Sequence, residues 1–160
     1  MVEEKRKCLV VIRVRGIPTA SSNVRRTLEM LHLCRTNHAT LVDSRPAYVG
    51  MLRTAQHYLT WGEVTKETLL ALITEKGRFI GGKKLTDEYV QKLGYKTLDD
   101  MAEAIHKTEV EYKDLQDIKP VFRLNPPSKG YKGKVKKSYV MGGATGYRGE
   151  AINDLIKRMI

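Results

Sequence analysis

The chain has 160 residues, of which 41% are hydrophobic and 29% charged, and its formal net charge is +11. That length suits one domain, or one domain with a sizeable appendage, and the positive excess makes nucleic acid or an acidic membrane surface the first candidate partner. No stretch is long and apolar enough to cross a bilayer, and no signal peptide is recognisable before the first predicted strand, which excludes a membrane-spanning protein and favours a cytoplasmic one.

The charge is unevenly distributed along the chain. Residues 1–62 carry ten basic and four acidic side chains, residues 63–118 carry nine and twelve, and residues 119–160 carry ten and two. Two basic segments therefore flank an acidic middle. A generally lysine-rich surface does not account for the last segment, so we expect a polyanion to bind there.

The first segment predicts a small α/β unit. Strands are expected at 8–16, 38–43 and 57–64, where β-branched and other apolar residues run together or alternate, and helices at 20–34 and 44–56 lie between them. This strand, helix, strand, helix, strand order favours a small sheet with both helices on one face.

The other face of that sheet is expected to be open. In the first strand Ile12 and Val14 point to one face, and Arg13 and Arg15 point to the other. If the helices cover Ile12 and Val14, the two arginines lie on the open face.

The two helices carry further candidate contacts. Arg25 and Arg26 lie away from the apolar stripe of the first helix. Pro46 suits the first turn of the second helix, but Gly50 in its interior costs about 1 kcal/mol relative to alanine. Either another backbone packs against Gly50 or a ligand approaches it closely.

The acidic middle is predicted to be helical. Three stretches, 65–77, 85–95 and 97–107, each have a threonine at or next to the start that can cap a helix. Most of the acids then lie on solvated helix faces. We therefore expect this part to be a structural extension rather than a binding surface.

The last segment is expected to hold a short strand at 119–124, a basic loop at 126–149 and a final helix with an apolar face. Its proline, glycine and lysine content argues against a packed element before residue 140, and Tyr131 and Tyr139 are suited to stack on bases or ribose. Because its like charges repel, we expect the loop to be disordered until phosphates offset them. Its lysines are Lys129, Lys132, Lys134, Lys136 and Lys137.

A glycine-rich stretch precedes the final helix. Gly143, Gly146 and Gly149 have the G-x-x-G-x-x-G spacing of some dinucleotide-binding loops. That site needs a second parallel strand and an acid about 20 residues further on, whereas eleven residues follow Gly149 and no Lys-Ser/Thr pair completes a P-loop. We therefore expect no cofactor, and we expect these glycines to bring the backbone close to RNA, with Arg148 beside them.

Catalytic and metal-binding patterns are weak. None of the four histidines stands in a recognisable nucleophile motif. Cys8 and Cys34 lack the C-x-x-C spacing of a zinc site, and His32, Cys34 and His38 have no evident fourth ligand. We expect no catalytic residue, no metal site and no small-molecule substrate.

Several stretches together resemble one known family. They are "TLVDSRPAYVGML", "TWGEV", "FRLNPP" and "GGATGYRGEAINDLIKRMI", in that order along the chain. These stretches are similar to the large-subunit ribosomal protein number thirty family, called number seven in eukaryotes, in its longer archaeal form. Residues of roughly 8–64 match the short bacterial core of the family, and residues 65–160 match the extension.

The resemblance implies a structural protein of the large ribosomal subunit with a ferredoxin-like α/β core and no catalytic activity. It would bind large-subunit ribosomal RNA near the 5S RNA and lie beside neighbouring ribosomal proteins. We divide the chain into an RNA-binding core (1–64), a helical acidic extension (65–118), and a strand, basic loop and helix that packs back on the core (119–160). The alternative is a non-ribosomal RNA-binding or ribosome-assembly protein, and a small nucleotide-dependent enzyme is a more distant one.

The candidate RNA-binding residues fall into three groups. The first is Gly50 with Arg45 and Arg53, because the stretch around them matches the family core most closely. The second group comes from the first strand and helix and consists of Arg13, Arg15, Arg25 and Arg26. The third group comes from the basic loop and consists of Lys129, Lys132, Lys134, Lys136, Lys137 and Arg148.

Overall fold

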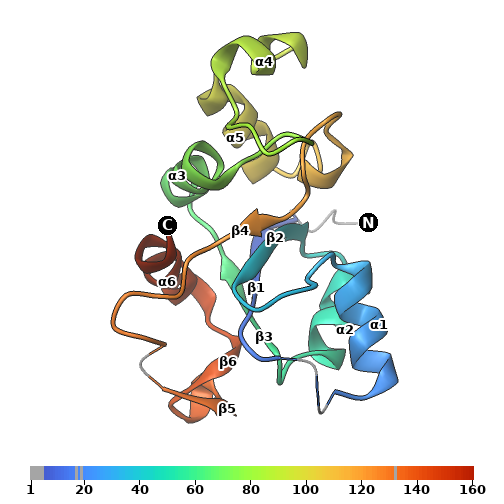
Figure 1. Ribbon diagram of the computed structural model, residues 1–160, viewed down its shortest axis with the longest axis vertical. Coiled ribbons are helices and arrows are strands. Elements are labelled where there is room, and N and C mark those ends of the chain that lie inside the picture. The colour runs from blue at the N-terminus through green and yellow to red at the C-terminus, as the bar shows by residue number, and fades with distance from the viewer. Residues whose placement is uncertain (1–5, 17, 19, 132) are drawn as a thin grey trace.

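The computed structural model describes residues 6–16, 18, 20–131 and 133–160. Within them one mixed sheet has the strand order β4-β2-β1-β3-β6-β5, and helices lie on both of its faces (Figure 1). The strands are β1 (Cys8–Arg13), β2 (His38–Asp43), β3 (Leu59–Glu63), β4 (Phe122–Arg123), β5 (Lys134–Ser138) and β6 (Gly143–Tyr147). The α-helices are α1 (Ser22–Met30), α2 (Pro46–Thr54), α3 (Lys66–Lys76), α4 (Asp87–Lys92), α5 (Leu98–His106) and α6 (Ile152–Met159).

The first part of the chain forms the predicted α/β unit. β1 lies between β2 and β3 and is antiparallel to both. Leu9 and Val11 of β1 pack in one buried cluster with Leu28 of α1 and Leu52 of α2. Burying a side chain of this size contributes roughly 1.5–3 kcal/mol. The expected α/β order is confirmed, with α1 and α2 together on one sheet face.

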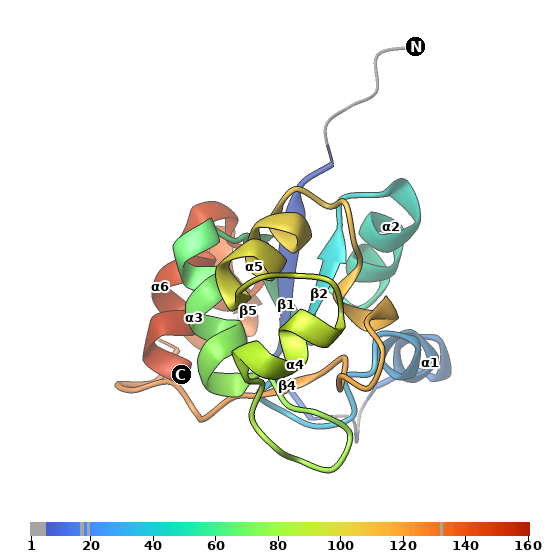
Figure 2. The same cartoon turned by 90° about the horizontal axis from the view of Figure 1, so that it is seen from above.

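The opposite face of the sheet is covered, and the expectation of an open face is wrong. Val10 and Ile12 pack there with Leu72 of α3, Ile105 of α5 and Ile156 of α6. In Figure 2 these three helices lie on one side of the sheet and α1 and α2 on the other. Both faces of β1 are apolar, so alternation along the strand did not indicate which face α1 and α2 would take.

The acidic middle is helical, as expected, and threonines begin its helices. Thr65 Oγ1 accepts a hydrogen bond from Thr68 N at 3.3 Å, and Thr97 Oγ1 accepts one from Asp100 N at 3.4 Å. Thr86 also precedes a helix, α4, but its side chain forms no capping hydrogen bond. In the part of the chain that the structure describes, no helix has both the length and the apolar character needed to cross a membrane.

The last segment contains more regular structure than predicted. The short strand predicted at 119–124 is confirmed as β4, which pairs with β2. The lysine-rich stretch that was expected to be an unpacked loop forms β5, which pairs with the parallel strand β6. β6 in turn pairs in parallel with β3, and the apolar side of α6 is fully buried against the core.

The glycines before α6 serve close backbone packing. A Cβ on Gly143 would lie 1.9 Å from Lys137 O in β5, and a Cβ on Gly62 would lie 2.0 Å from Gly149 O. Gly143 and Gly146 lie within β6 itself. The interpretation of this stretch as a turn that brings the backbone close to a phosphate is therefore wrong at Gly143, because β5 occupies that approach.

Candidate nucleic-acid interface

Lysines line the outer edge of the sheet. Lys134, Lys136 and Lys137 are exposed on β5, the last strand in the sheet order, and Lys129 is exposed in the segment before it. Lys132 lies outside the described residues. Like charges on an edge strand disfavour pairing with another protein strand and attract polyanions. This edge therefore suits phosphate rather than a second sheet.

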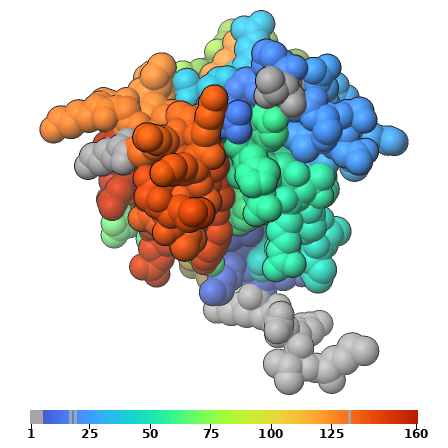
Figure 3. Space-filling view, turned by 90° about the horizontal axis from the view of Figure 1, so that it is seen from below, coloured from blue at the N-terminus to red at the C-terminus, as the bar shows by residue number. Residues whose placement is uncertain are grey.

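Two other elements share a face with this segment. Figure 3 shows the orange C-terminal segment beside the blue region of α1 and the green region of α2 and β3. Arg25 and Arg26 are exposed on α1, and Arg53 is exposed on α2. Arg25 donates through Nη2 to Pro18 O at 3.3 Å. We call the exposed cations of α1, α2 and β5 the basic set: Arg25, Arg26, Arg53, Lys134, Lys136 and Lys137.

Gly50 lies on the exposed side of α2. A Cβ built on it would meet nothing within 4 Å. Packing by the described part of the chain therefore does not explain a residue that costs about 1 kcal/mol inside a helix. Of the two sequence-based explanations, the close approach of a partner remains the hypothesis.

Arg13 is placed differently from the prediction. Arg13 is only 2% exposed. Its side chain donates through Nη1 to Leu33 O at 3.0 Å and through Nε to Arg15 O at 2.9 Å. Burial lowers the pKa of its guanidinium. Arg13 therefore donates to the carbonyls of Leu33 and Arg15 within the protein, and it does not belong to the exposed cations. Arg15 is half-buried, with its guanidinium carbon 5.0 Å from the centre of the Tyr58 ring.

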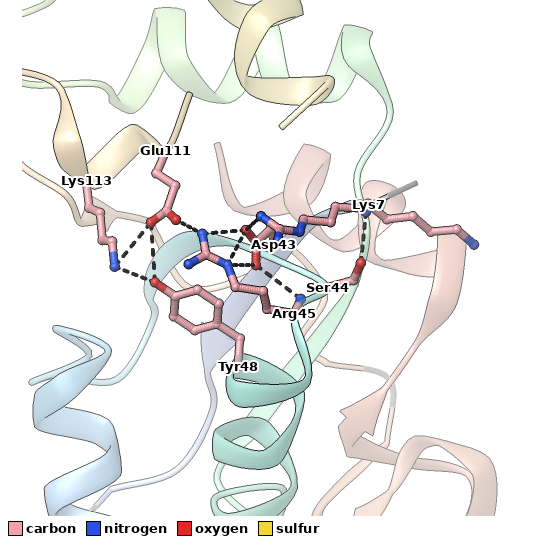
Figure 4. Close-up of polar contacts among 8 residues, drawn as sticks. Lys7, Asp43, Ser44, Arg45, Tyr48, Glu111 and Lys113 are labelled. Atoms are coloured by element: carbon pink, nitrogen blue, oxygen red, sulfur yellow. Dashed lines mark hydrogen bonds and ion pairs between the residues drawn. The ribbon is translucent and has the colours of Figure 1, made fainter. Parts of the chain in front are cut away.

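Arg45 joins the core to the extension (Figure 4). Its Nε donates to Asp43 Oδ2 at 2.8 Å, and its Nη2 lies 2.7 Å from the same oxygen. Nη2 also forms an ion pair with Glu111, which lies beyond α5. The hydrogen bond to Asp43 is the main reason that the pKa of Arg45 is raised. Two carboxylates thus neutralise a side chain that was predicted to bind RNA, and this geometry gives it a positioning role.

The same network includes the first turn of α2 and the segment after α5. Lys113 Nζ lies 3.2 Å from Glu111 Oε2 and donates to the hydroxyl of Tyr48. Near the start of β1, the Lys7 backbone N donates to Ser44 Oγ at 2.9 Å. Figure 4 shows these side chains converging on the turn between β2 and α2, so this turn is fixed from two sides.

Arg148 is also buried, contrary to its predicted contact with RNA. The residue is 8% exposed, and it donates through Nε to Thr60 Oγ1 at 2.8 Å and through Nη2 to Ala144 O at 3.0 Å. Burial lowers the pKa of its guanidinium. Its guanidinium carbon lies 4.9 Å from the centre of the Tyr139 ring. Arg148 therefore joins β3 to β6, and one face of Tyr139 is already occupied.

Tyr131 is held by the protein as well. It is half-buried, and its hydroxyl donates to Asn37 Oδ1. Burial raises the pKa of Tyr131 to about 12. This side chain therefore braces the C-terminal segment against the turn before β2, and stacking on a base is not its evident role.

Sequence reasoning missed an exposed apolar tip between β5 and β6. Val140 is 87% exposed and Met141 is 76% exposed, in a single turn of 3₁₀-helix. Tyr147 is also exposed, and its hydroxyl donates to Glu63 Oε1 at 2.6 Å. A two-residue apolar tip has no periodic pattern, so only the fold shows that it projects beside the lysines.

Sequence reasoning also missed a basic pocket next to β4. Its cations come from the end of α3 and from the strand segment that follows the extension, about forty residues later. They are Lys76, Arg78, Lys119 and Arg123. Lys76 and Arg78 belong to the acidic middle, where the excess of acidic residues hides their positive charge in the segment total.

Two further features of the described residues concern metal ions and larger ligands. In the described ranges, no three histidine, cysteine or carboxylate side chains lie close enough together to hold a metal ion. A hollow of about 860 Å³ beside β3 is lined by four cations, Arg6, Lys7, Lys66 and Lys107, and by two carboxylates, Glu63 and Glu150. The carboxylates offset part of that positive charge, so the exposed lysines and arginines of α1, α2 and β5 remain the candidate interface.

Known proteins resemble this chain over almost its full length. The family model described as Ribosomal protein L30p/L7e matches residues 9–59. A protein of Methanobrevibacter smithii named large ribosomal subunit protein uL30 is 49% identical over 152 residues, which cover 94% of this chain and 99% of the relative. Proteins of the same name from Methanosphaera stadtmanae and Thermofilum pendens are 46% and 43% identical, and each match covers 94% of this chain and 98% or 97% of the relative.

Proposed function

Since the chain belongs to the ribosomal protein L30p/L7e family, we propose that it is a structural component of the large ribosomal subunit and binds ribosomal RNA there. The observation that carries this proposal is the near-complete overlap with relatives that bear the name large ribosomal subunit protein. The family is one of ribosomal proteins rather than enzymes, so the role proposed is structural. A cytoplasmic location follows from that role.

The basic set is the part of the surface that we assign to RNA. Its members are exposed and come from three elements. Lysine and arginine contacts to phosphate position a protein on RNA without reading its sequence. Gly50 belongs to the same proposal, because a helix surface without a side chain lets RNA backbone approach closely. Arg13, Arg45 and Arg148 are left out, because the protein itself uses their donors.

Proximity to the 5S RNA and contacts with neighbouring ribosomal proteins are finer parts of the same proposal. The exposed tip at Val140 and Met141 is suited to a protein neighbour, because apolar side chains gain little from phosphate. Crosslinking within the intact large subunit tests both parts. Crosslinks from β5 to RNA, and from this tip to another protein, are the expected result.

Sedimentation of a lysate at low and high salt tests the main proposal. A ribosomal component should migrate with the large subunit at both salt concentrations and be absent from the free pool. A ribosome-assembly or free RNA-binding protein would be released at high salt, because salt weakens its phosphate contacts and it lacks the contacts with neighbouring ribosomal proteins that would retain it. A protein that stays at the top of the gradient at every salt concentration would refute the proposal.

A further inference from the structure

The basic pocket next to β4 contains positive charge that the acidic composition of the middle segment does not suggest. Its volume is about 220 Å³. Water occupies about 30 Å³ per molecule in the liquid, so this space accommodates a phosphate group with part of its hydration shell. Among the described residues, the lining groups include no carboxylate. They are Lys76, Arg78, Lys119 and Arg123, with Gly82 and Val121 between them.

Backbone pairing holds the two sides of the pocket together. Lys119 N donates to Arg78 O at 3.0 Å, and Phe79 and Ile118 form a β-bridge. Gly77 ends α3, and a Cβ at this position would lie 2.4 Å from Ile73 O. Because glycine has no Cβ, the chain can turn directly from the helix into Arg78. The four cations are therefore brought together by the fold and not by attraction to an acid.

Arg78 is oriented before any ligand binds. Its Nη1 donates to Glu75 O at 3.0 Å and to Gly77 O at 2.9 Å. Within the described chain, its Nε and Nη2 have no hydrogen-bond partner. Because a guanidinium is a rigid planar fork, fixing one nitrogen also fixes the direction of the remaining donors, and such a fork matches the geometry of a phosphate.

Arg123 places positive charge of the pocket next to β2. Arg123 lies on β4 opposite His38 of β2. The pKa of His38 is lowered, first by burial and then by the charges of Arg123, Arg35 and Arg13. His38, the β2 residue opposite Arg123, thus adds no negative charge to offset the cations, and an anion from outside the chain would do so.

We propose that this pocket binds a phosphate of the RNA backbone. The inference rests on the proposed function. It assigns an RNA contact to a pocket that the extension shares with the segment after it, whereas the sequence led us to treat the extension as structural only. An acidic protein segment is the other polyanion class. A guanidinium fork accepts a carboxylate or a phosphate, so the choice of phosphate follows from the proposed function, in which RNA is the surrounding polyanion.

Salt-dependent binding of RNA tests the pocket. The variant Lys119→Gln with Arg123→Gln removes two cations whose side chains form no hydrogen bond or ion pair with the described chain. The control, Lys92→Gln with Lys96→Gln, removes two exposed cations from the extension outside the pocket. Filter binding of deproteinised large-subunit RNA is measured between roughly 50 and 200 mM salt.

The pocket variant should reduce the slope of log affinity against log salt by about 0.9, because one phosphate contact is lost. Over that fourfold salt range the wild type then loses about 3.5-fold more affinity than the pocket variant. The control should keep the wild-type slope. If the pocket variant also keeps it while the wild type binds RNA, the pocket inference is overturned and the proposed function stands. If the wild type fails to bind RNA and fails to sediment with the subunit, the proposed function falls.

A second measurement needs no substitution and so does not depend on folding of a variant. Acylation of lysine amines, read by mass spectrometry, should modify Lys76 and Lys119 in the free chain and spare them in the large subunit. Ribonuclease treatment of the subunit should restore their reactivity. Protection that survives removal of the RNA would identify a protein as the occupant and overturn the inference.

Discussion

Two glycines that lie twelve positions apart should respond to the same substitution with opposite sign. At Gly50 in α2 an added Cβ meets nothing within 4 Å, whereas at Gly62 in β3 it would lie 2.0 Å from Gly149 O and 3.0 Å from Ile152 Cβ. Gly50→Ala should raise the free energy of unfolding by about 1 kcal/mol, because alanine has the higher helix propensity. Gly62→Ala should lower it by roughly 1–3 kcal/mol, because β3 and the start of α6 must move apart.

Thermal unfolding of the free chain, followed by far-ultraviolet circular dichroism, measures both effects. For a chain of this size 1 kcal/mol corresponds to about 2–4 °C in Tm. Gly50→Ala should therefore raise Tm by about 2–4 °C, and Gly62→Ala should lower it by about 2–12 °C. Each variant is the matched control for the other, because both replace a hydrogen with a methyl group.

A longer side chain separates the stability effect at Gly50 from the proposed approach of a partner. Gly50→Gln should also stabilise the free chain, because glutamine is a good helix former. It should nevertheless reduce incorporation into the large subunit, because the side chain fills the space left for RNA. A lower Tm for Gly50→Ala would refute the description of this site as open helix surface. Wild-type incorporation of Gly50→Gln would refute the close approach of a partner.

The remaining predictions concern a buried arginine, a buried tyrosine and the lysine edge. Arg148→Met should lower the free energy of unfolding by roughly 1–3 kcal/mol in a urea titration, because Ala144 O loses its donor, while Arg53→Met should change it by less than about 0.5 kcal/mol. Equal effects would contradict the structural role of Arg148. The pKa of Tyr131 is about 12, above its ordinary value of 10, so the folded chain retains a proton that the unfolded chain releases. Stability should therefore fall between about pH 10 and 12, and Tyr131→Phe should weaken that fall in alkaline unfolding curves. Replacing the three β5 lysines with glutamine should reduce the salt slope of RNA binding by about 2.7 in filter binding, and an unchanged slope would remove β5 from the interface. Those lysines are Lys134, Lys136 and Lys137.

Local patterns predicted the first five elements, because each pattern reports on its own stretch of chain. The threonine caps at Thr65 and Thr97 and the proline at the start of α2 are signals of the same kind. β5 was missed for the opposite reason. Its strand conformation depends on β6, and pairing with a distant partner overrides the low strand propensity of a lysine- and glycine-rich stretch.

The candidate site was predicted less well than the fold, because a cation's role depends on what lies within reach of its head group. The β5 lysines and Arg25 and Arg26 are exposed, as a binding role requires. Arg13 and Arg148 instead find buried carbonyls, which sequence spacing does not reveal. The basic pocket was missed since its two halves are distant in sequence and meet only through the pairing of Arg78 with Lys119.

The parallel pairing of β3 with β6 has a consequence for how the chain acquires its structure during synthesis. Thr60 pairs with Gly146, and Thr60 Oγ1 donates to Gly146 O across 86 residues of sequence. Until β6 has been made, one edge of β3 stays unpaired, although β1, β2 and both of their helices are already complete. Contacts of such long range slow folding, because a large loop must close before they form. A nascent chain therefore carries a sheet with one unpaired edge while the residues between β3 and β6 are added. β6 then pairs that edge, and α6 joins α3 and α5 on the sheet face.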